Sequence, residues 1–592
     1  MAKPLQAISI AAPGFFGLNT QESGLTLESG FALTADNCII DKYGRLGARK
    51  GWRYVTTSGG TGSNLTGSHR FIDIAGEETI LSWSATKFYK GTNTLTEITP
   101  TSDNTFADGN WQCVTLNDKA YFFQRGYKPM VYDPVAGTIT DVEDESNYSG
   151  RSINGTTQVP PGHSVISAYG RLWTADLQDP SDATYYNKMT VYWSDLLDGS
   201  DWNTGSAGSI DLSAILVNGT DEIVGFGAQN GQFIVFCKRN IVVFADGSAD
   251  ASFDPATLRL VEVISRVGCT ARDSIQNTGI DIFFLSEDGL RSLGRVIQEK
   301  SLPMRDLSRN VRDDIVQLTA DATPDDIKSV YSEDNAFYLL LFPDSERVYC
   351  FDTRAPLQDG SLRVTTWNTQ TQTNMLSLAN SVYFTQTNGL AEYYGYSDNS
   401  ATYPFTYFTN YFDFGNSTVT KILKRIAITV IGGIGQSFIF KSGFDYTSNH
   451  RSFPASLVDA SVSEFNIAEF GLTTTADAVS QAADTITNAD GEHHTVDFST
   501  TETTAYDVPI TVYLDDDTYY YEADDGSRTE TTLYVKSADY ASEYSTGTIA
   551  DIVRLAGGGS GNVLQIGFET TVNGFEISIQ KLDAYIKQGR VY

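Results

Sequence analysis

The sequence contains few cysteines and lacks any long apolar run. Five cysteines lie far apart in 592 residues, without a CxxC pair and mostly within apolar stretches: Cys38, Cys113, Cys237, Cys269 and Cys350. An odd number at such spacing favours reduced core residues over a disulfide framework. The N-terminal apolar run is too short for a signal peptide, and no run approaches the roughly 18 residues of a membrane span. We therefore expect the chain to be made and kept in a reducing compartment, without stable insertion into a membrane.

Stretches with helical spacing are also scarce, whereas aromatic residues make up 12% of the chain. This composition is typical of strands and predicts an all-β protein. One helix is expected over residues 302–318, where apolar residues recur at steps of three or four: Met304, Leu307, Val311, Ile315 and Leu318. The length of the chain predicts three or four structural units.

Basic residues are outnumbered, with 41 Lys and Arg against 73 Asp and Glu, so the formal charge is −32. This balance disfavours non-specific binding to nucleic acid, which depends on neutralising phosphates. Between residues 455 and 545, 19 acidic residues stand against Arg528 and Lys536 alone. More than half of the net charge thus lies in less than a sixth of the chain, which indicates a separate acidic module.

The middle of the chain is repetitive. Residues 221–294 contain two copies of a short strand, a Gly-containing turn, an apolar strand and another short strand, with the apolar strands at 233–237 and 280–285. A Gly or Asn turn before an aromatic-containing strand recurs at Gly76, Asn117, Gly170, Gly231, Gly279, Asn335 and Asn380. These intervals are close to the period of a propeller blade. We expect a β-propeller of six to eight blades over residues 68–400, with a multi-sheet β-sandwich array as the alternative.

Longer strands with period-two alternation follow the repeats. Residues 401–454 and 549–592 predict an antiparallel β platform domain, and Asn573-Gly574 predicts a hairpin within it. The acidic segment 455–548, rich in Thr, Ser, Asp and Tyr, would be a β-rich insertion between these two groups. Residues 1–67, with glycines at many turns, predict an ordered N-terminal strap without a core of its own.

No constellation of residues predicts catalysis, a cofactor or a resident metal. His493 and His494, with Asp497 nearby, do not predict a metal site. Neighbouring histidines on a strand point to opposite faces, and no third ligand is spaced to complete a site. Gly557 to Gly561 lacks the Lys-Ser/Thr of a phosphate loop, and no G-x-S-x-G is present. The seven tryptophans could line a carbohydrate cleft, but core packing explains them equally well: Trp52, Trp83, Trp111, Trp173, Trp193, Trp202 and Trp367.

Five aspartates in the acidic module are the candidate functional residues: Asp515, Asp516, Asp517, Asp524 and Asp525. Their carboxylates could hold Ca²⁺, but the alternating ligands of an EF-hand are missing, and a solvated hairpin turn fits better.

Several short motifs, in a fixed order, carry a resemblance to a known family. They are G-L-N-T-Q from Gly17, Asp36-Asn37, G-R-L-x-x-R-x-G from Gly44, W-S-D from Trp193 with Asp201-Trp202, Gly268-Cys269 with Ser274 and Asp288-Gly289-Leu290, Phe412 to Gly415, Lys424 to Ile426, and Leu582 to Arg590. Together they resemble the tail nozzle, tail tubular or tail-stabilisation proteins of short-tailed bacteriophages. The motifs span nearly the whole chain.

The resemblance implies a structural virion protein that is not an enzyme and has no cofactor. It implies a homo-oligomeric ring, a hexamer in that family, which docks to the head-tail adaptor ring. Tail fibres or spikes and a tail plug or needle would be further partners. Duplex DNA would pass during genome ejection without specific binding, and the protein would be synthesised in the host cytoplasm and end in the virion tail. The resemblance also implies that the five aspartates of the acidic module lie at a channel wall or a tip.

Two other functions remain open from the sequence. An acidic propeller can present paired carboxylates, so a glycoside hydrolase is the enzyme alternative. A β-propeller adhesin that binds a glycan without cleaving it is the other. Dependence on one or two carboxylates would identify the hydrolase, whereas saturable binding without turnover would identify the adhesin.

Overall fold

A computed structural model describes most of the chain and divides it into two compact units. The described residues are 5–57, 64–100, 106–216, 219–247, 253–299, 306–378, 381–433, 436–457 and 549–589, with five short strands between 483 and 530. The propeller unit comprises Phe16–Ser23 and Lys50–Ser400. The sandwich unit comprises Met1–Phe15, Gly24–Arg49 and Ala401–Tyr592.

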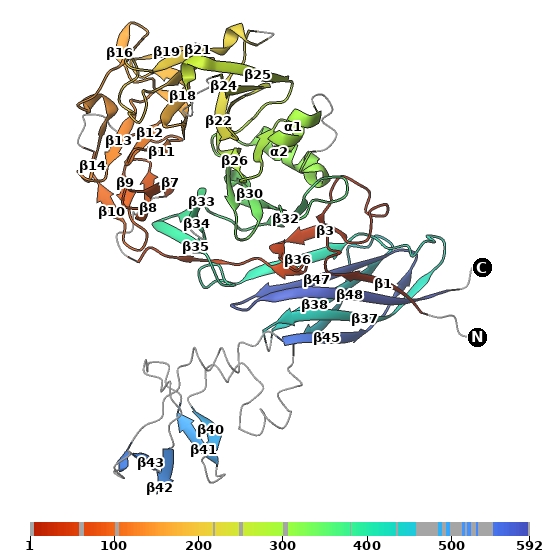
Figure 1. The fold of residues 1–592 in the computed structure, drawn as a ribbon. Helices are drawn as coiled ribbons and strands as arrows, with labels where there is room; N and C mark the ends of the chain where they lie inside the picture. Colours follow the sequence, from red (N-terminus) through yellow and green to blue (C-terminus); the bar gives the residue numbers. More distant parts are fainter. Residues whose placement is uncertain are drawn as a thin grey trace. The chain divides into compact units, whose positions relative to one another are not determined.

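The propeller unit contains, among the described residues, six antiparallel sheets of four or more strands and one of three. In chain order, the first three sheets are β7 (Leu65–Ile72), β8 (Glu78–Ser84), β9 (Phe88–Lys90) and β10 (Thr96–Ile98); β11 (Gln112–Leu116), β12 (Lys119–Phe123), β13 (Met130–Asp133) and β14 (Thr138–Asp141); and β17 (Gly162–Ala168), β18 (Arg171–Asp179), β19 (Asp182–Asn187), β20 (Thr190–Trp193) and β21 (Gly208–Asp211). The next two are β22 (Ile223–Gln229), β23 (Gln232–Cys237), β24 (Asn240–Asp246) and β25 (Leu258–Ser265), and the three-stranded sheet β26 (Gln276–Asn277), β27 (Ile282–Ser286) and β28 (Gly289–Ser292). The last two are β29 (Lys328–Ser332), β30 (Phe337–Phe342), β31 (Arg347–Asp352) and β32 (Arg363–Trp367), and then β33 (Asn374–Leu378), β34 (Ser381–Gln386) and β35 (Gly389–Tyr393) with β6 (Trp52–Tyr54). The first strands of successive sheets contact one another around a ring, and Figure 1 shows the sheets as blades. The expected all-β propeller is therefore confirmed.

The sequence repeats correspond to one recurring turn. In six of the seven sheets the predicted Gly or Asn lies in or beside the turn between the first two strands, and the seventh predicted residue, Asn380, lies outside the described residues. Five of these residues have positive φ, where Gly and Asn are tolerated best: Gly76, Asn117, Gly170, Gly231 and Gly279. The following strand is buried on both faces, as in β30, whose six residues are all buried. The turn therefore marks the entry into the apolar strand of each blade.

The expected N-terminal strap is not a separate segment. Strand β6, within it, pairs with β35 and forms the edge of the last blade, so it closes the ring. Strand β2 (Gly17–Leu18) pairs in parallel with β32 at Gly17 and Val364. Other strap residues form strands of the sandwich unit, described below. A turn-rich segment without its own core is thus absorbed into two neighbouring cores.

The helices are short and differ from the sequence prediction. Helix α1 covers Leu293–Glu299 and α2 covers Arg312–Asp321, with Ile315 buried. The helix expected over 302–318 is wrong in its bounds, because Val311 ends a 3₁₀ turn before α2 begins. The 3₁₀ helices are η1 (Val142–Asp144), η2 (Leu212–Ala214), η3 (Pro255–Thr257), η4 (Arg272–Ser274), η5 (Arg309–Val311) and η6 (Pro343–Ser345). A separate two-stranded sheet pairs β15 (Arg151–Ile153) with β16 (Thr156–Gln158). No helix in the described ranges is long and apolar enough to cross a membrane.

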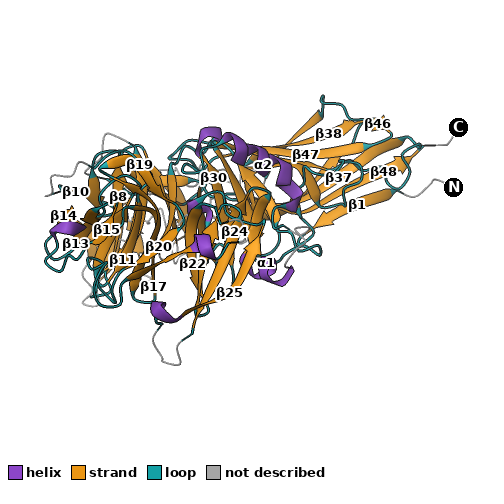
Figure 2. Ribbon diagram, turned by 90° about the horizontal axis from the view of Figure 1, so that it is seen from above, coloured by secondary structure: helices purple, strands orange, loops and turns teal. Residues whose placement is uncertain are grey.

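The sandwich unit is built from two antiparallel sheets, which Figure 2 shows edge-on. One has the order β4 (Cys38–Ile40), β5 (Leu46–Ala48), β48 (Ile577–Gln588), β37 (Lys421–Gly432) and β45 (Ile549–Ala556), with β1 (Gln6–Ala11) on β48 and β46 (Ser560–Gly561) on β37. The other has the order β3 (Phe31–Asp36), β36 (Tyr403–Thr409), β47 (Leu564–Val572), β38 (Ser437–Phe444) and β39 (Arg451–Ser456). Alternate residues of β37, including Ile426, Ile428 and Val430, are fully buried. Both sheets combine strands that precede the acidic segment with strands that follow it.

The hairpin expected at Asn573-Gly574 is wrong. Gly574 has the positive φ of a turn residue, but β47 before it and β48 after it belong to different sheets. The turn therefore carries the chain from one sheet of the sandwich to the other, since the long partners of both strands lie elsewhere in the sequence. Strand β37 likewise lies in the other sheet from β36 and β38.

Five strands are described within the acidic segment: β40 (Ala483–Thr487), β41 (His493–Asp497), β42 (Val512–Asp515), β43 (Thr518–Glu522) and β44 (Arg528–Glu530). They form a pair, β40–β41, and a three-stranded sheet, β42–β43–β44. The side chains of these strands lie outside the described part of the chain.

Candidate functional site: the axial network of the propeller

The five predicted aspartates are not tested by the structure. Asp515 ends β42 with an undescribed side chain, and Asp516, Asp517, Asp524 and Asp525 lie outside the described residues. The same holds for the side chains of His493, His494 and Asp497. Their role at a channel or tip stays a prediction.

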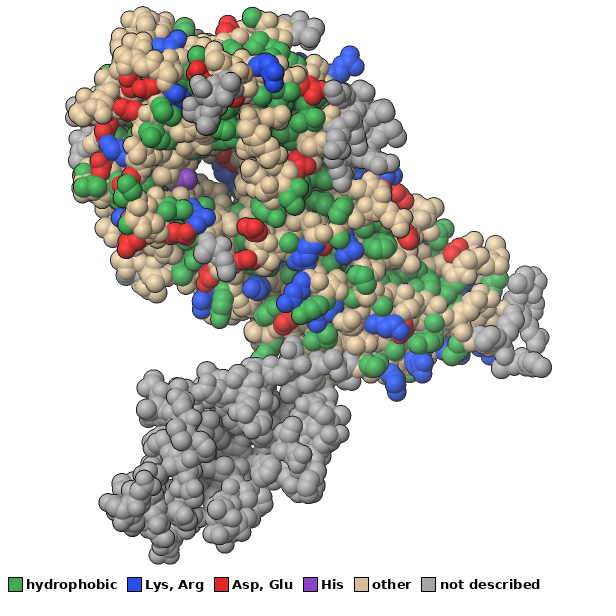
Figure 3. Space-filling view, in the orientation of Figure 1, with side chains coloured by type: hydrophobic (Ala, Val, Ile, Leu, Met, Phe, Trp, Pro, Cys, Tyr) green, Lys and Arg blue, Asp and Glu red, His purple; other side chains and the backbone are tan. Residues whose placement is uncertain are grey.

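A cluster that the sequence did not predict lies where the inner strands of several blades begin. We call it the axial network: Asn110, His163, Arg272, Asp273, Asp325 and Lys328. Asn110 precedes β11, His163 lies in β17, Arg272 and Asp273 lie in η4 before β26, and Lys328 begins β29. Figure 3 shows the propeller hollowed at its centre, with histidine and basic side chains at the wall. The network thus joins four sheets across the ring.

Asp273 is the centre of the network. Its carboxylate accepts hydrogen bonds from Arg272 Nε at 2.8 Å, from Lys328 Nζ at 2.5 Å and from Asn110 Nδ2 at 3.1 Å. Burial alone would raise the pKa of this carboxyl, but the charges of Arg272 and Lys328 outweigh it and hold the pKa well below its usual range. Asp273 is therefore a fixed anion between two buried cations.

Both cations make further hydrogen bonds, Arg272 to backbone carbonyls of two other sheets and Lys328 to the side chain of Asn110 and to a carbonyl of its own segment. Arg272 donates from Nη1 to the carbonyl of His163 at 2.6 Å and from Nη2 to that of Asn110 at 3.1 Å. Lys328 donates to Asn110 Oδ1 at 2.6 Å and to the carbonyl of Asp325 at 2.8 Å. Such charge-assisted bonds are stronger than neutral ones. They hold the inner strands together.

His163 is the one titratable ring of the network, and it is 5% exposed. Burial, and then the charge of Arg272, lower the pKa of its imidazole, so the ring is neutral at pH 7. Its Nε2 lies 3.1 Å from Asp325 Oδ1. Because an ionised carboxylate only accepts, Nε2 carries the proton, and Nδ1 has no hydrogen-bond partner among the described residues.

A second chain of ion pairs connects three blades beside the network. Arg125, after β12, contacts buried Asp176 of β18 and lies 3.9 Å from Glu222, which precedes β22. Lys188, after β19, reaches the same Glu222 at 2.9 Å. The two sets of contacts together link five of the seven sheets. These ion pairs and hydrogen bonds therefore hold neighbouring blades of the ring together.

The tryptophans belong to the core rather than to a sugar cleft. Six of the seven are at most 7% exposed, and only Trp52, in β6, is partly exposed. Trp173 packs against Trp193 and Phe233 with ring centroids 5.3 and 4.2 Å apart. The five cysteines are likewise buried and present as thiols, as the sequence predicts. In the described ranges, no group of three His, Cys, Asp or Glu residues could hold a metal ion.

The motifs at residues 36–51 meet in one buried contact of the sandwich unit. Arg49 is 1% exposed, donates from Nε to Asn37 Oδ1 at 3.0 Å, and stacks on Tyr403 with its guanidinium 4.1 Å from the ring centre. Asn37 donates to the carbonyl of Pro404 at 2.8 Å. The Tyr403 hydroxyl donates to the carbonyl of Arg49. These motif residues therefore join the N-terminal strands to β36.

The mid-chain motifs are structural as well. Ser194 Oγ accepts the Leu172 amide at 3.1 Å, and Trp202 is fully buried. In the next motif, Ser274 Oγ accepts the Leu285 amide at 3.0 Å and donates to the carbonyl of Ala271 at 2.6 Å. Each motif residue satisfies a buried backbone group at a corner where a blade turns.

No family model matches the sequence, and no curated protein is significantly similar to it. Among solved structures, the computationally designed Ika8 protein aligns at 12% identity over 64% of this chain and 98% of its own, with a TM-score of 0.33. The Pan2 WD40 domain of Neurospora crassa aligns at 8% identity over 56% of this chain and 88% of its own, with a TM-score of 0.32. PorZ of Porphyromonas gingivalis aligns at 10% identity over 81% of this chain and 60% of its own, with a TM-score of 0.30. At these scores no functional argument rests on them.

Proposed function

We propose that the protein is a structural subunit of a short phage tail, a nozzle protein that assembles into a ring and forms part of the conduit for genome ejection. The observation that carries the proposal is the contact of Asn37, Arg49 and Tyr403. The motif residues Asn37 and Arg49 form a buried contact there between the first strands and the last third of the chain. The resemblance is therefore one of architecture, as a structural role requires.

The axial network supports the same proposal. Its carboxylate Asp273 is bound by Arg272, Lys328 and Asn110, and its lysine by three oxygens. A hydrolase needs a carboxylate that can exchange a proton or attack a sugar. A carboxylate clamped between two cations is suited to rigidity instead. The glycoside hydrolase is thus the weaker alternative at this location.

The acidic segment has a defined role in the proposal. Duplex DNA carries about one negative charge per 1.7 Å of its axis, so a wall of aspartates would not retain a passing genome. Salt limits the repulsion to about 8 Å at physiological ionic strength, and so a wide channel stays open. Asp515, Asp516, Asp517, Asp524 and Asp525 would then speed the passage of DNA without binding it.

The first experiment is negative-stain microscopy with light-scattering mass, on the purified chain alone and mixed with head-tail adaptor rings. The proposal predicts closed rings with an axial hole, alone or templated on the adaptor, and a mass near six chains. A monomer that ignores the adaptor rings would contradict it. Deleting residues 2–50 is unsuitable as a test, because β1 pairs with β48 and the deletion removes strands from the sandwich core.

The channel role needs its own variant and a matched control. The five candidate aspartates are replaced together by Asn, and ejection rate is measured against salt. The control replaces five exposed aspartates of the propeller unit by Asn, which changes the net charge equally: Asp144, Asp321, Asp326, Asp334 and Asp344. Slower ejection at low salt in the first variant alone is expected. Equal rates in both variants would exclude the channel role while leaving the ring proposal intact.

A further inference from the structure

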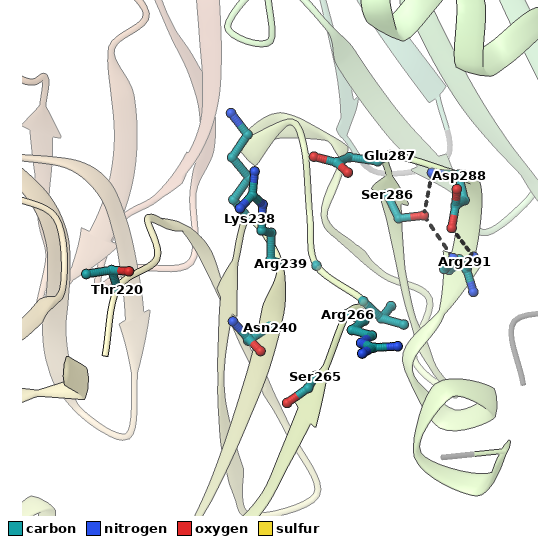
Figure 4. A pocket seen from close by; sticks show the side chains of 12 residues that line it. Thr220, Lys238, Arg239, Asn240, Ser265, Arg266, Ser286, Glu287, Asp288 and Arg291 are labelled. Carbon is teal, nitrogen blue, oxygen red and sulfur yellow. Dashed lines mark hydrogen bonds and ion pairs between the residues drawn. The ribbon is translucent and has the colours of Figure 1, made fainter. Parts of the chain in front are cut away.

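A basic pocket lies in the propeller unit where two turns and a strand end meet. The β23–β24 turn, the end of β25 and the β27–β28 turn surround a cavity of about 510 Å³ (Figure 4). We call it the basic pocket and define it by Lys238, Arg239, Asn240, Ser265, Arg266 and Arg291. Four cations line it against two acidic residues, Glu287 and Asp288. This is a local positive excess in a chain of charge −32.

Only one of the four cations is neutralised. Arg291 is 5% exposed and donates to Asp288 Oδ2 at 3.1 Å and to Ser286 Oγ at 2.9 Å. Lys238, Arg239 and Arg266 are exposed and have no ion-pair partner among the described residues. Their charge is therefore available to a ligand.

The backbone that carries these cations is firmly held. The amide of Lys238 donates to the carbonyl of Glu222 at 2.8 Å, and Asn240 Nδ2 donates to Asp221 Oδ2 at 2.6 Å. At Gly268, a Cβ would come within 2.4 Å of the backbone of Cys237 and Lys238, so the two segments pack without space for a side chain. The pocket is thus preformed, which lowers the entropic cost of binding.

Arg266 occupies a backbone conformation that favours glycine. Its φ is +68°, in the left-handed region, where a residue with a side chain is strained. Strained residues of this kind cluster at binding sites. An arginine at such a position is more easily explained by its charge than by the turn.

We propose that the basic pocket binds a phosphorylated sugar. Guanidinium groups bind phosphate oxygens in a two-pronged geometry, and Lys238 adds a point charge. The cavity lies in the usual range for small-molecule sites, about 300 to 1,000 Å³, and so can accommodate more than a phosphate group. Asn240 and Ser265 supply polar groups for sugar hydroxyls. A free sugar phosphate and a phosphate-bearing glycan share this chemistry. The site is a binding function beyond that of a conduit.

Isothermal titration calorimetry on the full chain tests the proposal, with glucose 1-phosphate, glucose and inorganic phosphate as probes. We expect glucose 1-phosphate to bind more tightly than either of the others. The variant Lys238→Gln, Arg239→Gln, Arg266→Gln should lose at least tenfold in affinity. The control, Arg259→Gln with Arg347→Gln, removes two exposed propeller cations that do not line the pocket and have no ion-pair partner among the described residues, and it should bind normally. Equal loss in both variants, or none in either, would overturn the proposal.

The variant Arg266→Gly separates binding from folding, because it removes the charge while relieving the backbone. It should bind glucose 1-phosphate more weakly and unfold at a higher temperature than the wild type. An immobilised phosphomannan tests the glycan source, and retention that glucose 1-phosphate competes away supports the site. Binding of a 20-base-pair DNA duplex, lost in the pocket variant, without binding of glucose 1-phosphate, would assign the pocket to nucleic acid instead and overturn the proposal.

Discussion

Two arginines six residues apart, Arg272 and Arg266, have opposite environments. Arg272 is 5% exposed and donates to Asp273 and to two backbone carbonyls of other sheets. Arg266 is exposed, has no ion-pair partner among the described residues and lies on a strained backbone. In a chain this acidic, counter-charges are abundant. The lack of an ion-pair partner for Arg266 among the described residues therefore distinguishes a cation that holds the fold from a cation that is available to a ligand.

The largest expected effect comes from removing the anion of the axial network. Asp273→Asn keeps the shape but leaves Arg272 and Lys328 buried without their counter-charge, which should lower the free energy of unfolding by about 3 kcal/mol. Urea unfolding of the propeller unit measures it. Asp359→Asn, which breaks the exposed pair with Arg309, should cost less than about 1 kcal/mol. Similar losses of unfolding free energy in the two variants would show that the axial network stabilises the fold no more than an exposed ion pair does.

Arg49→Lys tests whether a buried arginine acts through its shape as well as its charge. Lysine keeps the charge but cannot stack on Tyr403 while donating to Asn37, so we expect a loss of about 2 kcal/mol, in the sandwich unit only. Calorimetry with two resolved transitions would show it. A shift of the propeller transition instead would contradict the assignment.

The pH dependence tests the buried histidines. Burial lowers the pKa of His69 to about 4, and it also lowers that of His163. Between the unfolded value of about 6.5 and pH 4 the unfolded chain therefore binds more protons, and stability falls as the pH falls. Asp306, whose pKa burial raises to about 6, acts in the opposite direction. The comparison is therefore with His69→Gln: the wild type should lose about 3 kcal/mol of unfolding free energy relative to this variant from pH 7 to pH 4. A constant difference would show that His69 titrates normally.

The smallest effects are expected in the basic pocket. Lys238→Gln should change the free energy of unfolding by less than about 0.5 kcal/mol. Arg266→Gly should raise it by about 1 kcal/mol, because glycine adopts positive φ without strain. Thermal unfolding without ligand measures both. A large loss of stability in either variant would mean that these cations serve the fold after all.

The propeller was predictable because its signal is local and repeated. Gly231 and the apolar strand that follows it lie in a few consecutive residues, and the same pattern returns in every blade. The hairpin at Asn573-Gly574 failed for the opposite reason. A turn signal predicts the reversal of the chain, but β47 pairs with β36 and β38, both more than 100 residues away in the sequence.

The axial network could not be predicted from any one stretch. Asn110, His163, Asp273 and Lys328 are separated by some 50 to 110 residues, and each alone is a polar residue near a strand. Their common signal is position, at or before the first strand of a blade. Aligning the repeats by their turns would have brought Asn110, His163 and Lys328 into one column, seven residues before the turn residue, with Asp273 in the next column. Cations without partners carry no such signal, since pairing is visible only in three dimensions.

The closing strand β6 also constrains how the protein can fold. Residues 52–54 pair with residues 391–393, and β1 pairs with the last long strand, β48. During synthesis the ribosome must therefore make more than 300 residues after β6 before the ring can close. It must make more than 500 residues after β1 before β1 can pair with β48. Long-range pairing of this kind folds slowly and leaves strand edges open meanwhile. A nascent chain would thus carry unpaired strands at β6 and β1 until β35 and β48 had been made.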